Sequence, residues 1–518
     1  MEPAGARRRA VTGEAVVIGG GPNGLAAAIR LAEAGVAVTV LEAADHAGGA
    51  VRTEELTLPG FRHDTFSAVY PAAAASPVFA RMPLAEHGLE WIHPRACMAH
   101  PLPDGSAAVL YRDLEATARS LDRQHAGDGE RWAEFASPYL DGFAAVRATM
   151  LSGFPPVGGA LRLLGSAGPT ATLGFARLLI GPATSLGHRL FRGQGSRVWL
   201  YGAAMHGDAP PGKPGSGIAA FYLNLLGHAV GWPSPRGGAQ RLADALVGYL
   251  RSLGGSLQTG ARVERILAGG GRVRGVGVAG GQELPASIVI ADVMPHALVA
   301  MAGDALSGWY RQLLDRYVYG PGTVKVDWAL DGPIPWRARE VHEAGTVHVG
   351  GDEQSVLEAI AGSATGLPER PFLLCGQQST ADATRAPEHK HTAWAYTHGP
   401  NGIDGLGGER HVERIEAQVE RFAPGFRERV LARHVLGPMD MQARNANLVG
   451  GDVGGGSYRL RQAVFRPLPK LSPYHTALPG LFLGSAATFP GGAVHGVPGD
   501  AAARAALRRR GRRADRAD

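Results

Sequence analysis

Short apolar runs and an alanine-rich segment alternate in the first part of the chain. Residues 15–18 (Ala-Val-Val-Ile) are wholly apolar, which predicts a parallel strand that is buried on both faces. Residues 25–34 are rich in alanine and predict a helix, with Pro22 near its first turn and Gly35 just past its end. Residues 36–41 contain alternating valines and predict a second strand. This order predicts an α/β fold that contains a Rossmann-like domain.

Similar patterns recur far along the chain. The apolar run between Gly480 and Gly484 predicts another buried strand, and residues 500–509 predict a helix that follows it. Between the two ends, the pattern predicts a helix that ends near residue 253, a strand pair from 263 to 281, and strands over 287–291 and 323–331.

Glycines lie at the junction of the first strand and the first helix, with the spacing G-x-G-x-x-G. Such a loop lets backbone N–H groups approach a pyrophosphate at the N-terminus of a helix, where the dipole favours anions. A carboxylate at the end of the second strand can accept hydrogen bonds from a ribose diol. A second match, Gly275 to Gly280, is not followed by a predicted helix and is interpreted as structural. The predicted dinucleotide site contains Gly19, Gly21, Pro22, Asn23, Gly24, Glu42 and Ala43.

A second glycine pair, Gly48 and Gly49, follows this carboxylate, with Arg52 three residues later. The segment resembles the D-x-x-G-G-x-x-x-T sequence of the flavoproteins that include monoamine oxidases and phytoene desaturases. The resemblance implies that the cofactor is FAD, with these glycines and a basic residue at its pyrophosphate. Monoamine oxidases usually carry arginine directly after the glycines, where this chain has Ala50.

The C-terminal glycine-rich segment 491–499 resembles the terminal signature of phytoene dehydrogenase-like flavoproteins, with Phe489 where that family often has histidine. A loop of this kind, between a strand and a helix, presents N–H groups that favour the negative charge of a reduced flavin. The family resemblance also implies that the backbone of Val263 contacts the adenine, although packing alone would place valine there too. The C-terminal residues predicted to bind non-covalent FAD are Gly484, Ser485, Gly491, Gly492, Ala493 and Val494.

These separated motifs predict a discontinuous FAD-binding domain and a second, α+β domain that binds the substrate. The FAD-binding domain is expected over residues 14–100, 232–300 and 456–507, the substrate-binding domain over 101–231 and 301–455, and basic tails over 1–13 and 508–518.

The strand over residues 323–331 resembles the KVDWALDGP strand of the same group, and its period of two places Lys325 and Asp327 on one face. In several monoamine oxidase relatives a strand lysine approaches flavin N5 through a water, so the resemblance makes Lys325 the candidate catalytic residue. A surface Lys–Asp pair beside buried valines is the alternative. Weaker candidates are His63, Asp64, Tyr70, Trp394 and Tyr396.

Composition excludes several classes of function. The net charge of +6 comes from arginines near the two ends, and no internal basic stripe is interleaved with aromatic residues, so nucleic acid is not expected as a partner. Cys97 and Cys375 form no CxxC pair, which excludes a dithiol centre and a cysteine-rich metal site. Glu14 separates the basic start of the chain from the apolar run 15–18, so a signal peptide is not expected, and the low cysteine content fits a reducing cytoplasm.

Residues 150–230 are apolar and rich in glycine and proline. A substrate tunnel, a monotopic membrane face and ordinary helical core all fit this composition. The resemblance implies hydride abstraction from an apolar substrate, such as a polyene or another isoprenoid-like compound. The alternatives are a flavin amine or amino-acid oxidase, and a flavoprotein that acts mainly as an interaction partner. The sequence does not determine the oligomeric state.

Overall fold

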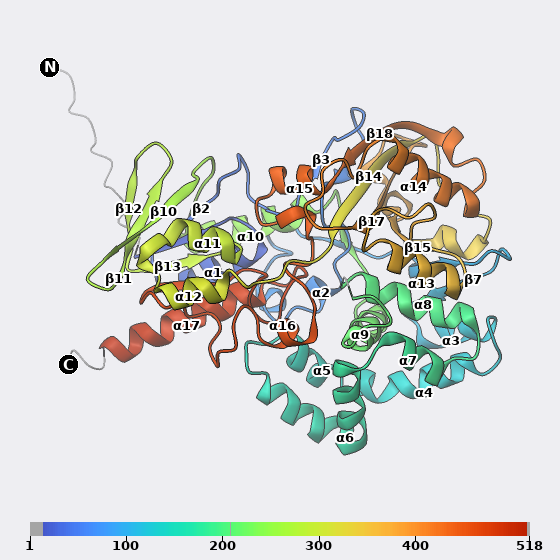
Figure 1. The fold of residues 1–518 in the computed structure, drawn as a ribbon, viewed down its shortest axis with the longest axis horizontal. Coiled ribbons are helices and arrows are strands. Elements are labelled where there is room, and N and C mark those ends of the chain that lie inside the picture. The colour runs from blue at the N-terminus through green and yellow to red at the C-terminus, as the bar shows by residue number, and fades with distance from the viewer. Residues whose placement is uncertain (1–13, 208, 515–518) are drawn as a thin grey trace.

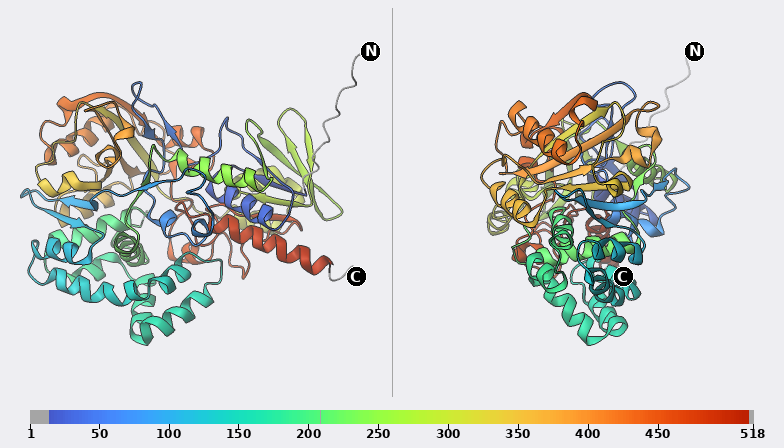
Figure 2. Two further views of the ribbon diagram at one scale, coloured as in Figure 1. Left: turned by 180° about the vertical axis from the view of Figure 1, so that it is seen from behind. Right: turned by 90° about the vertical axis from the view of Figure 1, so that its right-hand side faces the viewer.

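The computed structural model describes residues 14–207 and 209–514. One lobe is built around a parallel sheet and the other around a larger mixed sheet (Figure 1). A layer of helices lies beneath the mixed sheet in all three views (Figures 1 and 2). The predicted α/β fold class with a Rossmann-like domain is confirmed.

The parallel sheet draws its strands from nearly the whole length of the chain. Its order is β19-β13-β1-β2-β9, and every neighbouring pair is parallel. The central strand therefore comes from the first residues described and an edge strand from the last part of the chain. The strands are β1 (Ala15–Ile18), β2 (Val38–Leu41), β9 (Ser256–Gln258), β13 (Ile288–Ala291) and β19 (Leu481–Leu483).

Both faces of this sheet are covered, as its wholly apolar strands require. Ala15 and Val17 pack toward one set of helices, whereas Val16 and Ile18 pack toward the opposite layer. The first set comprises α1 (Pro22–Glu33), α10 (Gln240–Ser252) and α17 (Val497–Ala514). The opposite layer comprises the antiparallel strands β10 (Val263–Gly269), β11 (Arg272–Val278) and β12 (Glu283–Pro285), with α11 (Pro295–Ala302) and α12 (Gly308–Leu314).

The C-terminal helix is longer than the pattern predicted. Residues 508–514, expected to belong to a basic tail, continue α17, because alanine and arginine are strong helix formers and cations are favourable near a helix C-terminus. Residues 1–13 and 515–518 lie outside the described residues.

The mixed sheet has seven strands in the order β18-β14-β17-β16-β15-β6-β7. Trp328 and other residues of one face pack against helix α14 (Glu409–Phe422). Strand β6 belongs to this sheet, although residues 14–100 were assigned to the FAD-binding domain; it pairs with β15 and β7. The other boundaries stay a prediction. The strands are β6 (Ala96–Pro101), β7 (Ala107–Leu110), β14 (Gly322–Leu330), β15 (Ala344–Val349), β16 (Leu373–Gly376), β17 (His391–Gly399) and β18 (Val430–Leu436).

The helical layer holds an aromatic core in which Trp132 contacts Trp199 and Phe221. Its helices are α3 (Leu114–Asp122), α4 (Asp128–Asp141), α5 (Phe143–Met150), α6 (Val157–Ile180), α7 (Ala183–Leu190), α8 (Gln194–Met205) and α9 (Ser216–Ala229). Short elements complete the fold: α2 (Pro71–Ala74), α13 (Glu353–Gly362), α15 (Pro438–Arg444), α16 (Leu460–Val464), β3 (Thr53–Glu54), β4 (His63–Asp64), β5 (Trp91–Ile92) and β8 (Ser234–Pro235).

The two ends of the chain meet where the first turn of α17 packs on the first turn of α1. A Cβ at Gly499 would overlap the carbonyl oxygen of Asn23, and the Cα of Gly499 lies 3.3 Å from the position that a Cβ of Gly484 would occupy. Because a side chain cannot fit there, glycine is required for the contact.

We expect Gly499→Ala to lower the free energy of unfolding by about 2 kcal/mol or more, because the added methyl group forces α17 away from α1. Urea denaturation followed by circular dichroism measures this change. Gly366→Ala is the matched control, since nothing lies within 4 Å of a Cβ at that position. Equal stability of the two variants would show that the contact is looser than described.

Candidate active site

A cavity of about 1190 Å³ begins at the carboxyl ends of the parallel strands and extends toward the mixed sheet and the helical layer. Ligands of open α/β sheets bind outside these strand ends. A site for one drug-sized ligand occupies about 300–1,000 Å³. The cavity is therefore large enough to hold a cofactor together with a substrate.

The two N-terminal glycine segments form one wall of the cavity. The N–H of Gly48 donates to the carbonyl oxygen of Gly20 at 2.9 Å, and a Cβ at Gly49 would lie 3.1 Å from the Cα of Gly21. A Cβ at Gly24 would overlap the carbonyl oxygen of Gly19. The loops thus pack backbone against backbone. Of the predicted residues in these loops, Gly19, Gly21, Pro22, Asn23 and Gly49 line the cavity, whereas Gly24 and Gly48 support it from behind.

Glu42 is fixed at the end of β2 by two backbone donors. Its carboxylate accepts hydrogen bonds from the N–H of Gly20 at 2.6 Å and of Ala44 at 2.8 Å. Each carboxylate oxygen has a further lone pair, so Glu42 can still accept hydrogen bonds from a ribose. Ala43 and Val263 line the same part of the cavity, as predicted for residues near the adenosine.

Asp292, at the end of β13, was not predicted as a site residue. It lines the cavity, and its Oδ2 accepts a hydrogen bond from the N–H of Gly24 at 2.9 Å. Burial raises the pKa of Asp292 to about 7, and the charge of Glu42 raises this pKa further, whereas the bond from Gly24 lowers it. An acidic residue directly after the apolar run 287–291 was the available sequence signal, but its partner lies 268 residues away.

Arg52 lines the cavity but is not a free cation. Its Nη2 lies 3.2 Å from Glu54, which also pairs with Arg444 at 3.1 Å. The Nε of Arg52 is buried without a hydrogen-bond partner, so one donor of the guanidinium is still available to a ligand.

The C-terminal loop forms a further part of the cavity wall. Ser485, Gly492, Ala493 and Val494 line the cavity, while Gly484 and Gly491 lie behind it. Ala493 has a φ of 77°, a left-handed conformation that is uncommon for a residue with a Cβ and is often found at functional sites. A Cβ at Gly492 would overlap the carbonyl oxygen of Gly454. Every predicted cofactor residue therefore either lines the cavity or is adjacent in sequence to a residue that does.

Lys325 projects from β14 to the same cavity, on the face opposite Trp328. Its Nζ donates to the carbonyl oxygen of Asp64 at 3.0 Å and to the carboxylate of Asp327. The alternative of a surface Lys–Asp pair is wrong, because Lys325 is 2% exposed and Asp327 is fully buried. Burial raises the pKa of Asp327 to about 6, although the charge of Lys325 lowers it.

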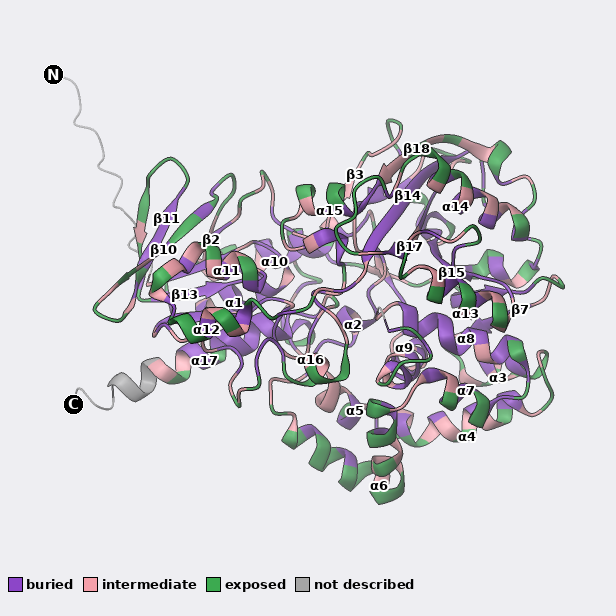
Figure 3. Ribbon diagram, in the orientation of Figure 1, coloured by how far each residue is buried: buried purple, intermediate pink, exposed green. Residues whose placement is uncertain are grey.

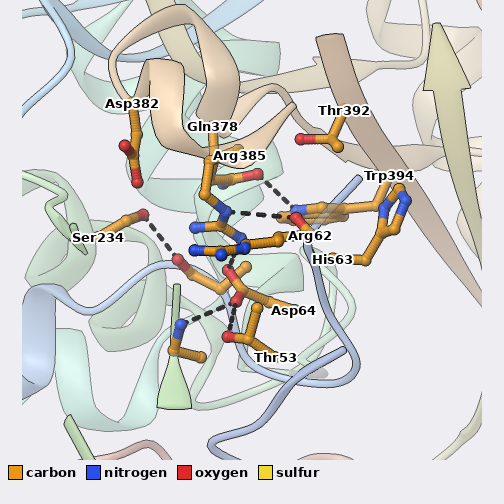
Figure 4. A network of polar contacts seen from close by, with 12 residues as sticks. Thr53, Arg62, His63, Asp64, Ser234, Gln378, Asp382, Arg385, Thr392 and Trp394 are labelled. Atoms are coloured by element: carbon orange, nitrogen blue, oxygen red, sulfur yellow. Dashed lines mark hydrogen bonds and ion pairs between the residues drawn. The ribbon is translucent and has the colours of Figure 1, made fainter. Parts of the chain in front are cut away.

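Asp64, whose carbonyl oxygen accepts the hydrogen bond from Lys325, also takes part in the polar network shown in Figure 4. Its Oδ1 accepts hydrogen bonds from the Oγ1 of Thr53 at 2.7 Å and the N–H of Ala239 at 2.8 Å. Its other oxygen forms an ion pair with Arg385 at 2.5 Å. Both partners of this ion pair are almost fully buried. With Lys325, the network joins four segments that are distant in sequence, at residues 53–64, 239, 325 and 385.

Two other weak candidates, Trp394 and Tyr396, line the cavity beside Lys325. Their rings are stacked, with centroids 5.9 Å apart and planes inclined by 18°, and the Nε1 of Trp394 donates to Gln378 at 2.7 Å. Tyr70 also lines the cavity, whereas His63 and Asp64 do not. Burial lowers the pKa of His63 to about 3, with further lowering by Lys325, so His63 is neutral near pH 7.

The part of the cavity that faces the helical layer is apolar. Glu42 and Asp292 are the only carboxylates among the described lining residues, and both belong to the nucleotide end. The apolar part includes Met150, Leu151, Phe154, Ile218, Tyr222, Leu223, Leu226 and Trp232. His206 also lines this part of the cavity, and its Nε2 lies 2.8 Å from the Nε2 of the buried His348. Burial lowers the pKa of His206 to about 3, which keeps it uncharged.

The family model described as "NAD(P)-binding Rossmann-like domain" matches residues 17–82. A pyridine nucleotide-disulfide oxidoreductase domain-containing protein 2 from Rattus norvegicus is 27% identical over 550 residues, which cover 96% of this chain and 93% of the relative. A neurosporene-forming phytoene desaturase from Rhodobacter capsulatus is 26% identical over 516 residues, covering 94% and 92%. The chain is a homologue of the phytoene desaturases. The resemblance inferred from the sequence motifs is thus confirmed.

An oxidoreductase from Methanosarcina mazei has the same fold as this phytoene desaturase homologue. Its structure superposes with a TM-score of 0.63 at 17% identity, and the match covers 95% of this chain and 99% of the other. The Rossmann-like match and the glycine loops together identify a site for a dinucleotide cofactor. The roles of the individual site residues stay predictions.

We expect the free energy of unfolding of the wild-type protein to fall as the pH rises, and Asp292→Asn to abolish this fall. The pKa of Asp292 is about 7 in the folded protein, whereas its ordinary value is 3.8. Between these two pH values the folded state therefore keeps a proton that the unfolded chain has already lost. Stability therefore falls as the pH rises through this window, by a few kcal/mol at most, since one pKa unit is about 1.4 kcal/mol. The asparagine still offers an oxygen to Gly24.

Urea denaturation of the cofactor-free protein, at pH values below and above the window, measures this difference. The exposed Asp104 provides a control, because contacts with Ser106 lower rather than raise its pKa. In Asp104→Asn, the free energy of unfolding should fall between the two pH values as it does in the wild-type protein. The same fall in Asp292→Asn would mean that another titrating group causes it.

Proposed function

We propose that this chain is an FAD-dependent oxidoreductase that removes a hydride from an apolar substrate, in a dehydrogenation or desaturation of a polyene or another isoprenoid-like compound. The observation that carries this proposal is one continuous cavity. It begins at the dinucleotide loops, passes Lys325 and ends in an apolar chamber.

FAD fits the residues of the nucleotide end. The loops supply backbone N–H groups at the N-terminus of α1, Glu42 supplies a fixed carboxylate, and buried Asn23 retains an Oδ1 without a hydrogen-bond partner. The C-terminal loop brings a second set of backbone donors to the same cavity from nearly 470 residues further along the chain. A nicotinamide dinucleotide alone would account for the N-terminal glycine loops but not for the C-terminal loop in the same cavity.

When bound, FAD supplies the hydride acceptor, and the protein has to position the substrate and exclude water. The walls of the apolar chamber do both, because they offer few hydrogen bonds to water. The ammonium of Lys325 is held in one place by Asp327 and the Asp64 carbonyl, with its charge toward the cavity. We propose that Lys325 stabilises negative charge that develops at this point of the cavity.

The lining argues against the amine-oxidase alternative. A protonated amine in a buried chamber needs an anionic or π partner, and the described chamber residues include no carboxylate. Trp394 and Tyr396 form an aromatic pair. To hold a carbon group of a substrate between them, however, two rings need to be about 7 Å apart or more. Their centroids are 5.9 Å apart, so the two rings contact each other instead.

Reduction of the bound flavin tests the function. We expect the purified protein to be yellow, to release FAD on denaturation, and to lose its flavin absorbance when mixed anaerobically with a detergent-solubilised polyene. Primary amines and amino acids should leave the absorbance unchanged. Bleaching by amines alone would establish the oxidase alternative, and an FAD that no substrate class reduces would favour a role as an interaction partner.

Loss of the Glu42 carboxylate should weaken FAD binding. Charge-assisted hydrogen bonds are worth about 1.5–3 kcal/mol, so we expect Glu42→Ala to lower the FAD affinity about ten- to a hundredfold. Fluorescence titration of the cofactor-free protein measures the affinity. Glu42→Gln retains one neutral acceptor and should lose less, and the exposed Glu358→Ala should lose nothing. An unchanged affinity in Glu42→Ala would refute the assignment of the ribose site.

A further inference from the structure

Helix α6 carries large apolar side chains that the described parts of the chain leave uncovered. It lies at the edge of the molecule and is mostly exposed in Figure 3. The interpretation of residues 150–230 as ordinary helical core is wrong for this helix, although α8 and α9 are buried. The side chains of Val157, Leu161, Leu164, Leu173, Leu179 and Ile180 are between 37% and 64% exposed.

By length and composition, α6 is apolar enough to cross a membrane, and 17% of its apolar window is buried. Its geometry favours a position along a bilayer surface instead. Gly168 has a φ of 77° and a ψ of 174° and is followed by Pro169, so the helix is broken into two halves. A spanning helix needs about 20 continuous residues. Leu163, Phe175 and Leu178 are buried and hold both halves against the protein.

The charges around α6 suit an anionic surface. Residues 142–207 contain no aspartate or glutamate but six arginines, of which Arg162 and Arg177 lie exposed on α6 itself. Arginines close to a membrane are attracted by anionic lipid headgroups. The same distribution disfavours a second copy of this chain as the partner, because a twofold contact through α6 would bring the arginines of the two α6 helices close to each other.

The exposed face continues onto α16. Leu460, Val464 and Phe465 are 37–43% exposed, and the ring of Phe465 contacts Phe154 with centroids 6.1 Å apart. This part of the chain is also free of acidic residues, from 453 to 499. The exposed apolar residues of α6 and α16, with Phe465 directly after α16, are called the apolar face below.

The apolar face borders the cavity. Leu179 of α6 and Leu460 and Val464 of α16 line the cavity as well as being exposed. Phe154 and Pro156, in the segment that leads into α6, line it too. The same side chains therefore face the solvent on one side and the apolar chamber on the other.

We propose that the apolar face docks on an anionic lipid bilayer without crossing it, and that the cavity opens toward the acyl chains at this place. Docking buries exposed leucines among the acyl chains and brings the arginines to the headgroups. An apolar molecule dissolved in the bilayer then reaches the cavity between α6 and α16 without passing through water. The docking itself does not depend on the reaction proposed above.

Vesicle flotation of the purified full-length protein tests the docking. We expect binding to phosphatidylcholine vesicles that contain phosphatidylglycerol, and weaker binding to phosphatidylcholine alone or at high salt. The double variant Leu161→Asp and Leu173→Asp should reduce binding roughly tenfold or more. Arg162→Glu with Arg177→Glu should abolish the preference for anionic vesicles, since each arginine contributes roughly fivefold.

Leu431→Asp is the matched control. Leu431 is 46% exposed on β18, on the far side of the molecule from α6 in Figure 1, and its substitution should leave binding unchanged. Thermal unfolding and sedimentation of each variant check that it folds and report its oligomeric state. The proposal would be overturned if the wild-type protein does not bind vesicles, or if the leucine variants bind them as well as the wild type does. A wild-type dimer that the leucine variants dissociate, without vesicle binding, would instead make this face a contact between copies.

Discussion

The close approach of backbones around the first turn of α1 is the constraint on which the rest of the structure depends. Gly24 packs on the carbonyl of Gly19, Gly499 packs on the carbonyl of Asn23, and Gly49 packs on Gly21. These contacts bring the first and last parts of the chain to the carboxyl ends of the same parallel strands. They also place the glycine loops around one cavity at the N-terminus of α1, where the helix dipole favours an anionic cofactor. A side chain at any of these positions would separate the walls of the site.

Local sequence patterns predicted the elements around this constraint well, because their signals are short in range. The apolar run 15–18 became β1, the run 287–291 became β13, and the glycines marked the turns between strand and helix. The glycine spacing also predicted which loops face the cavity, since a turn of this kind allows little variation. The family resemblance, the fold class and a dinucleotide site all follow from such local patterns.

Features that depend on distant partners could not be predicted in the same way. The sequence around Asp292 does not reveal that Gly24 donates to it, nor does the sequence around Asp64 reveal Arg385, 321 residues later. The exposure of α6 was equally hidden, because its leucines resemble those of core helices and only packing distinguishes the two. The last turns of α17 were missed for the opposite reason: arginine-rich sequence suggested a tail, although it continues a helix that is anchored elsewhere.

The polar network at Asp64 shows why such hidden contacts matter to the site. Two buried carboxylates, Asp64 and Asp327, lie among two buried cations, Lys325 and Arg385, so their charges balance within the network. Breaking one buried pair would leave an uncompensated charge at a cost of several kcal/mol, which makes the arrangement stable only as a whole. Since Ala239 also donates to Asp64, the network fastens β14 of the mixed sheet to a segment beside the parallel sheet. Besides the strand pairing of β14, buried charge therefore helps to set the position of Lys325, whereas the chamber beyond it is lined mainly by apolar side chains.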